Sequence, residues 1–373
     1  MKDNCAPLLF VLAGLLAGCA NNPKASSMTL KDAFKDHFLV GAALNDSQCS
    51  GTNAAQVALI TQQFNSITPE NVLKWDSIHP KPETYNFEPG DRYVAFGRKH
   101  NMFIIGHTLV WHNQTPKWVF ENDGGGVADR ETLLARMRDH ISTVVGRYKG
   151  QVNGWDVVNE VLNDDGTLRD SPWLKIIGED YIAKAFEFAH EADPQAELYI
   201  NEFSLENTPK RDGAIALLKK LKAGGAPVSA IGSQDHVKMD WPAPAQIEAM
   251  VGDFSRAGVK VMITELDVDL LPPVTHSRDA EVSLRVKSDP AKNPYTNGLP
   301  DSVQQQLAAR YAELFAAYLK YPGAVSRVTF WGVTDGDSWL NTWPAKGRTS
   351  YPLLFGRDCR PKPAFAAVLQ TAN

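Results

Sequence analysis

Two glutamates stand at the ends of apolar runs, where their carboxyl groups could together cleave a glycosidic bond. Glu160 ends the run VNGWDVVNE at 152–160, and Glu265 lies in the run KVMITELDV at 260–268. Glycosidic hydrolysis needs one carboxyl group that protonates the departing oxygen and a second that attacks the sugar or activates water. For either glutamate alone, a structural role is as common as a catalytic one. The pair predicts a carbohydrate-cleaving site.

The elements that position these glutamates follow a regular alternation of β-rich runs and longer helical patterns. The segment 130–150, for example, repeats apolar residues at helical spacing. Eight strands that alternate with helices predict a single-domain α/β fold, a (β/α)8 barrel, over residues 29–373. The eight predicted strands are 38–44, 65–70, 102–110, 152–160, 196–203, 229–237, 260–268 and 327–335.

An open, doubly wound sheet is the alternative fold for such a pattern. No GxGxxG motif follows the first predicted strand, and polar residues follow many strands rather than gathering at one switch point. In a barrel, polar residues at the C-terminal ends of the strands all reach one rim, which is where barrel enzymes keep their chemistry. We therefore prefer the barrel, with both glutamates on that rim.

Charge and composition narrow the partners. The formal net charge of -5 and the absence of long basic runs argue against nucleic acid, because phosphate binding needs a concentrated positive face. A neutral polymer is compatible, and the nine tryptophans offer flat apolar faces for sugar rings. No CxxC or HExxH motif suggests a metal site, and two carboxyl groups with water suffice for hydrolysis without a cofactor. Nothing indicates a dimer, so we expect a monomer.

Polar and aromatic residues follow several other predicted strands. Taken singly, each is more often a core residue than a functional group, but together they would wall one pocket mouth. These residues are Glu70, Asn71, Lys74, His107, Trp111, Gln234, His236, Trp331 and Trp339.

The ordered motifs TPENVLKW, GHTLVWH, WDVVNE, GSQDH, ITELD and FWGVTDGDSW spread over almost all of residues 29–373. In this order they resemble glycoside hydrolase family 10, the endo-β-1,4-xylanases. The resemblance implies a (β/α)8 fold and a retaining double displacement on the β-1,4-linked xylose backbone of xylan and xylo-oligosaccharides. A related β-1,4-glucanase stays open as an alternative, and so does a glycan-binding lipoprotein without catalysis.

The resemblance also implies roles for individual residues. Glu160 matches the family's acid/base and Glu265 its nucleophile. Asn159 matches the residue that holds the sugar 2-hydroxyl, and His236 with Asp267 matches the pair that supports the nucleophile. The positions that match the glycone side of the cleft are Glu70, Asn71, Lys74, His107, Trp111, Gln234, Trp331 and Trp339.

One departure from the family pattern falls after the fifth predicted strand. The family commonly has Asp-Tyr-Asn after its asparagine, whereas here Asn201 is followed by Glu202, Phe203 and Ser204. The tyrosine hydroxyl is therefore missing, which leaves the leaving-group-side contacts open. The connection 268–301 is also unusually long, and Tyr295 within it is a candidate for substrate contact.

The N-terminal residues predict export. Residues 1–19 contain an apolar stretch too short to span a bilayer, and LAGC at 16–19 resembles a bacterial lipobox. We expect cleavage before Cys19, acylation of its sulfur, a polar tether at 20–28, and an outer-membrane lipoprotein on a face that the sequence leaves open. A plain signal peptide and a secreted protein are the alternative. Cys49 and Cys359 are the only other possible cysteine pair, and the sequence does not favour a disulfide between them.

Overall fold

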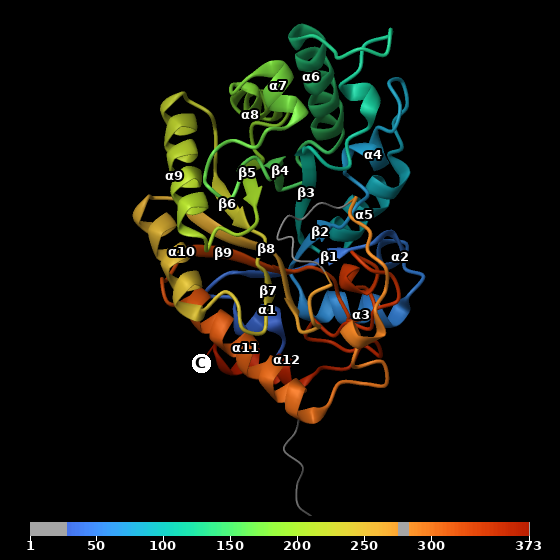
Figure 1. The fold of residues 1–373 in the computed structure, drawn as a ribbon, viewed down its shortest axis with the longest axis vertical. Helices are drawn as coiled ribbons and strands as arrows, with labels where there is room; N and C mark the ends of the chain where they lie inside the picture. The colour runs from blue at the N-terminus through green and yellow to red at the C-terminus, as the bar shows by residue number, and fades with distance from the viewer. Residues whose placement is uncertain (1–27, 275–282, 373) are drawn as a thin grey trace, which may run out of the picture.

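The computed structural model describes residues 28–274 and 283–372, and its centre is a closed parallel barrel (Figure 1). Neighbouring strands pair in sequence order, β9 pairs with β1, and β6 pairs with β8, which closes the ring. The (β/α)8 prediction is therefore confirmed. The strands are β1 (Leu39–Leu44), β2 (Ser66–Pro69), β3 (Phe103–Val110), β4 (Gly154–Asn159), β5 (Glu197–Glu202), β6 (Ala230–Ser233), β7 (His236–Lys238), β8 (Lys260–Asp269) and β9 (Val325–Phe330).

Six of the predicted strands agree with observed strands to within two residues at each end, and the other two differ more. The sixth predicted run is divided into β6 and β7, which both pair with β8, because Asp235 between them has a φ of 55° that an extended strand cannot accommodate. The eighth predicted run ends at Phe330 rather than 335. Gly332 has a φ of 128°, a conformation that glycine adopts readily and that does not continue a strand.

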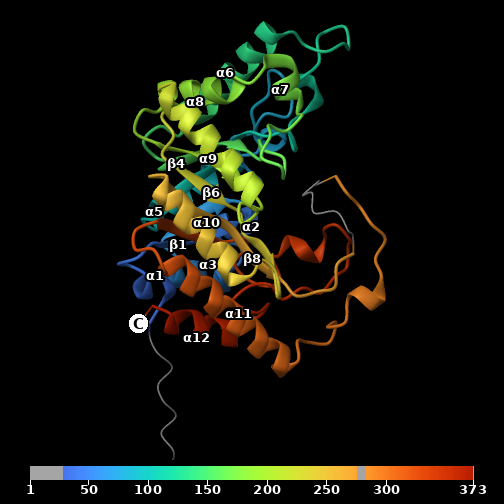
Figure 2. The same ribbon diagram turned by 60° about the vertical axis from the view of Figure 1, so that its left-hand side comes forward.

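Helices surround the barrel (Figures 1 and 2). The predicted helix at 130–150 is α6, which ends at Arg147 and begins after Asp129, whose carboxylate accepts the N–H of Thr132. The helices are α1 (Leu30–Ala33), α2 (Asp46–Cys49), α3 (Ala54–Gln63), α4 (Trp75–Ile78), α5 (Glu88–Lys99), α6 (Arg130–Arg147), α7 (Pro172–Ile177), α8 (Tyr181–Ala192), α9 (Thr208–Ala223), α10 (Pro244–Arg256), α11 (Asp301–Leu319) and α12 (Pro363–Gln370).

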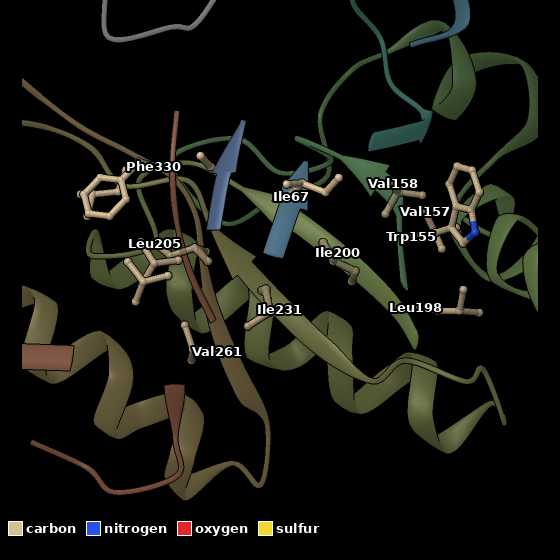
Figure 3. Close-up of a cluster of buried hydrophobic side chains, with 14 of the residues drawn as sticks. Ile67, Trp155, Val157, Val158, Leu198, Ile200, Leu205, Ile231, Val261 and Phe330 are labelled. Carbon is tan, nitrogen blue, oxygen red and sulfur yellow. The ribbon is translucent and has the colours of Figure 1, made fainter. Parts of the chain in front are cut away.

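The core is formed by apolar side chains of the strands and of the helices that cover them (Figure 3). Trp155 on β4 is buried, and a Cβ atom at Gly106 on the adjacent β3 would lie 2.0 Å from its ring. Glycine at this position is therefore required by the close approach of the indole.

Strand register brings the functional ends together. Asn159 on β4 pairs with Asn201 on β5, which pairs with Gly232 on β6. A Cβ atom at Gly232 would lie 2.4 Å from the Asn201 side-chain oxygen, so this glycine leaves room for the asparagine. Because all the strands are parallel, their C-terminal ends form one rim.

In the long connection between β8 and α11, residues 283–300 lie away from the barrel wall in Figure 2. Its later part is tied to the segment after β9: Asn293 accepts the N–H of Thr349, and the Tyr295 carbonyl accepts the hydroxyl of Tyr351. Tyr295 is half-buried rather than fully exposed. This part of the connection therefore supports the segment after β9 at the rim.

Residues 1–27 lie outside the described residues, so the predicted leader, Cys19 and most of the tether stay predictions. In the described ranges, no helix is both long enough and apolar enough to cross a membrane. Cys49 and Cys359 are both free thiols.

Candidate active site

Glu160 stands at the C-terminal end of β4 in a left-handed backbone conformation, with a φ of 56°. Such a conformation is uncommon for a residue with a side chain and is held by surrounding contacts. Its N–H donates to the Asn201 carbonyl at 2.9 Å, and its carbonyl accepts from Arg169 Nε at 2.9 Å. The backbone of Glu160 is therefore fixed on both sides.

The Glu160 carboxyl group is buried and accepts two hydrogen bonds. The indole N–H of Trp111 donates to Oε2 at 2.9 Å, and the amide of Gln234 donates to Oε1 at 3.0 Å. Burial raises the pKa of Glu160 to about 7, with the negative charges of Glu202 and Glu265 adding to the rise and the two hydrogen bonds opposing it. Glu160 therefore keeps its proton in acidic solution.

Glu265 on β8 has the opposite electrostatic character, although it is also buried. Burial raises its pKa, but the hydrogen bond from His236 and the charges of neighbouring cationic groups outweigh burial and leave the pKa below its usual value. Asn201 Nδ2 donates to Oε1 at 2.7 Å, and His236 Nε2 lies 3.2 Å from Oε2. Glu265 is therefore an ionised carboxylate.

A second carboxylate, that of Asp267, holds His236 in place and keeps it protonated. Burial lowers its pKa, but Asp267, with Oδ1 3.0 Å from Nδ1, and then Glu265 raise it to about 10. Asp267 Oδ2 also accepts the indole N–H of Trp339 at 2.7 Å. His236 is therefore an imidazolium that donates to Glu265, and Asp267 orients both His236 and Trp339.

A continuous chain of side-chain contacts joins the two glutamates. The Gln234 amide nitrogen lies 3.0 Å from Glu160 Oε1 and 3.5 Å from Asn159 Oδ1. Asn201 Nδ2 then donates to both Asn159 Oδ1, at 3.0 Å, and Glu265 Oε1, at 2.7 Å. The sequence prediction that both carboxyl groups are aimed at one place is in keeping with this arrangement.

The other predicted wall residues surround the same rim. Lys74 is buried, and its ammonium donates to Asn71 Oδ1 at 3.1 Å and lies 5.2 Å from the ring centroid of Trp111. Burial lowers the Lys74 pKa, which Glu265 and Glu70 counteract. Burial also raises the pKa of Glu70, and the positive charge of Lys74 is the main effect that opposes this rise. A charged, hydrogen-bonding wall therefore stands beside the carboxylates.

His107 and Trp331 complete the set of predicted residues. His107 Nδ1 lies 2.9 Å from Asp156 Oδ2 in the barrel interior. Trp331 meets the rings of His107 and His236 edge to face, with centroids 5.5 and 6.3 Å away. Trp331 is buried, while Trp339 is partly exposed and packs against His236.

Sequence reasoning did not assign functions to Asn201, Glu202, Arg169 or Asp156, although all four support the site. Asn201 could have been found, because it immediately precedes a glutamate near the end of its predicted strand, as Asn159 does, and the two asparagines are paired across neighbouring strands. Arg169 lies in a loop, and only the three-dimensional structure shows that it reaches the Glu160 carbonyl. In the ranges that the structure describes, no cluster of three or more His, Cys, Asp or Glu side chains could hold a metal ion.

A parallel barrel with two buried glutamates of opposite pKa shift on its C-terminal rim has the carboxyl groups that glycoside hydrolysis requires. The family model described as glycosyl hydrolase family 10 matches residues 29–371. The chain belongs to this family.

Relatives and solved structures of the same family cover nearly the whole chain. The endo-1,4-beta-xylanase A of Xylanibacter ruminicola is 44% identical over 92% of this chain and 93% of its own length. A GH10 endoxylanase from a sugarcane soil metagenome is 46% identical, with a TM-score of 0.88 over 91% of this chain and 99% of its own.

A third comparison is a structure of the intracellular xylanase of Thermoanaerobacterium saccharolyticum in complex with xylotetraose. It is 35% identical, with a TM-score of 0.79 over 91% of this chain and 97% of its own.

The hydrogen bond from Trp111 to Glu160 leads to a prediction about protonation. Because this bond favours the ionised carboxylate, Trp111→Phe is expected to raise the pKa of Glu160 by about half a unit to one unit. The measurement is a pH titration that follows the ¹³C NMR signal of the Glu160 side-chain carboxyl carbon.

Trp118→Phe is the matched control, because the Trp118 indole donates to the Pro80 carbonyl instead of a carboxylate. It should leave the Glu160 titration where it is in the unaltered chain. A Glu160 pKa that falls, or does not change, in Trp111→Phe would contradict the assignment.

Proposed function

We propose that this protein hydrolyses internal β-1,4-xylosidic linkages of xylan and xylo-oligosaccharides with retention of anomeric configuration, Glu160 serving as acid/base and Glu265 as nucleophile. The observation that carries the proposal is the opposite direction of the two pKa shifts in one connected site. The xylanase names of the relatives support the choice of xylan as substrate.

The first step forms a bond between Glu265 and the sugar. The ionised Glu265 attacks the anomeric carbon, and Glu160 gives its proton to the oxygen that leaves. Glu265 needs no proton removed beforehand, because His236 and Asn201 already hold it as the carboxylate. Glu160 needs none supplied, because burial keeps it protonated.

The second step releases the sugar by hydrolysis. Once Glu265 has become a neutral ester, its negative charge no longer raises the pKa of Glu160, so the deprotonated Glu160 is stabilised as a base toward water. Asn159 supports both steps if its contact with the sugar 2-hydroxyl strengthens in the transition state, where binding energy raises the rate. Its side-chain oxygen is oriented by Asn201, which leaves the amide end for the substrate.

Two indoles provide the basis for preferring xylose over glucose. Xylose lacks the C6 hydroxymethyl group, and the bulky Trp331 and Trp339 stand beside His236 at the wall of the site. Steric exclusion of that group would favour xylan over a β-1,4-glucan without any added attraction. A glycan-binding protein without catalysis would have no use for the opposed protonation of two glutamates, which disfavours that alternative.

Anomeric-proton NMR during hydrolysis of xylohexaose tests the reaction. We expect the β-anomer of the new reducing end to appear first, since two displacements at one carbon restore the configuration. Internal cleavage should give xylobiose, xylotriose and xylotetraose together. Cellohexaose run in parallel should react at least about 100-fold more slowly, which is the range that pocket exclusion of one group provides.

The α-anomer appearing first would overturn the retaining mechanism. Comparable rates on the two hexaoses would overturn the role of the tryptophans in sugar selection, and no cleavage of either would overturn the proposed activity.

The division of roles between the glutamates can be tested by leaving-group chemistry. Glu160→Ala should lower kcat/KM on xylohexaose about 10²–10⁴-fold, because a sugar leaves poorly without a proton. An aryl xylobioside with a good leaving group should still react in the first step, and the glycosyl-enzyme should accumulate with an initial burst of the phenol.

Glu265→Ala is the matched variant, and it should abolish both reactions because no ester can form. Equal losses on the two substrates for Glu160→Ala, with no accumulated intermediate in mass spectrometry, would reverse or remove the assignment.

We also propose that the catalytic domain is anchored to the outer membrane through an acylated Cys19, as the LAGC motif suggests. In a Gram-negative host, Cys19→Ser should move the protein from the membrane fraction to the soluble fraction, because one signal for anchoring is removed. Cys5→Ser, which changes a cysteine outside the motif, should leave it in the membrane fraction. Membrane association of Cys19→Ser equal to that of the unaltered chain would contradict this proposal.

A further inference from the structure

We propose that the buried ion pair between Glu202 and Lys210 is a positioning device for the proton-donating carboxyl of Glu160, which it serves by holding the loop after Glu160 and by setting the charge beside it. The inference rests on the proposed function, in which Glu160 is the acid. Neither residue of the pair belongs to the wall of the site described above.

Glu202 connects the two segments that hold Glu160. It ends β5, is fully buried, and its Oε1 accepts the N–H of Leu162 at 2.8 Å. Its carbonyl accepts the N–H of Gln234 at 2.8 Å, and the side chain of Gln234 donates to Glu160 Oε1. One residue therefore anchors both the loop that follows Glu160 and the residue that donates to the Glu160 carboxyl.

Leu162 is held at both of its backbone polar groups. Its N–H donates to Glu202, and its carbonyl lies 3.3 Å from an Arg169 nitrogen that can donate to it. The Arg169 Nε donates to the Glu160 carbonyl itself. The Glu202 carboxylate accepts a hydrogen bond from the loop, and the Arg169 guanidinium donates hydrogen bonds to the loop. Together they hold Glu160 in its left-handed backbone conformation.

Lys210 compensates the charge of Glu202. It lies in the first turn of α9 and is fully buried, with Nζ 2.9 Å from Glu202 Oε2 and 3.9 Å from Asp164 Oδ1. Its ammonium also lies 3.4 Å from the ring centroid of Phe203. Burying two charges is costly and contributes little net stability compared with apolar packing, so this pair is better explained by placement than by stability.

The carboxylate of Glu202 also acts on Glu160 through space. Burial and the two hydrogen bonds have the largest effects on the pKa of Glu160. The negative charge of Glu202 comes next, and it raises that pKa. Burial raises the pKa of Glu202 too, while Lys210 opposes that rise. The charged or titratable groups that face Glu160 or Glu202 from the surrounding elements are Lys74, Arg169, Tyr181, Lys210 and Glu265. Asp164 faces Lys210 instead.

The test removes the charge and keeps the shape. Glu202→Gln retains an oxygen that can accept the N–H of Leu162 but loses the negative charge. The double variant Glu202→Gln/Lys210→Met removes both charges, so that no unpaired ammonium is left in the interior. The double variant therefore answers the question if the single variant does not fold, as judged by circular dichroism and thermal unfolding.

The expected result is a shift of the alkaline limb of kcat/KM on xylohexaose to lower pH by about half a unit or more in Glu202→Gln. The double variant should shift it in the same direction by less, because Lys210→Met also removes a positive charge that opposes the charge of Glu202. The plateau at acidic pH should stay within about threefold, because the loop keeps its hydrogen bond. With an aryl xylobioside that has a good leaving group, this shift should vanish, since its first step needs no proton from Glu160.

Glu179→Gln is the matched control, because Glu179 forms an exposed ion pair with Lys220 at the surface. It should leave the profile unchanged. A ¹³C titration of Glu160 in the same variants needs no substrate, so it distinguishes failure of this inference from failure of the proposed function. An alkaline limb and a Glu160 titration that do not move in folded Glu202→Gln or in the double variant would overturn the inference.

Discussion

The site depends on keeping two buried carboxyl groups in opposite protonation states. Burial alone would raise the pKa of both Glu160 and Glu265. The difference comes from the donors: Glu265 receives a charged imidazolium that Asp267 keeps protonated, whereas Glu160 receives neutral indole and amide groups. A charged donor stabilises a carboxylate more than a neutral donor does. Most polar contacts around the rim serve this asymmetry.

The strand order and the placement of the two glutamates on the rim could be predicted from the sequence because both depend on local patterns. Apolar runs of strand length alternate with helical spacing, and a polar residue at the end of a parallel strand must reach the rim. The break between β6 and β7 could not be predicted, because it depends on Asp235, whose positive φ is accompanied by hydrogen bonds from Ser233 and Tyr318.

The supporting contacts were harder to foresee because they join residues far apart in the chain. Lys210 is the third residue of a helix, where a lysine ordinarily points to solvent, yet here it is fully buried against Glu202. Sequence comparison with the family drew attention to the segment 202–204 only as a missing tyrosine hydroxyl. The structure shows a further role for that segment, since the cations of Arg169 and Lys210 both lie over the ring of Phe203, 5.6 and 3.4 Å from its centroid.

The chain of contacts between the glutamates draws on β4, β5, β8 and the turn after β6. Its outer supports come from the segments after β2, β3 and β9, and β9 pairs with β8 on one side and with β1, from the other end of the sequence, on the other. No half of the polypeptide contains the whole set. Hydrolysis by this molecule thus requires the closed barrel, and the appearance of turnover during refolding would report when β1 and β9 pair.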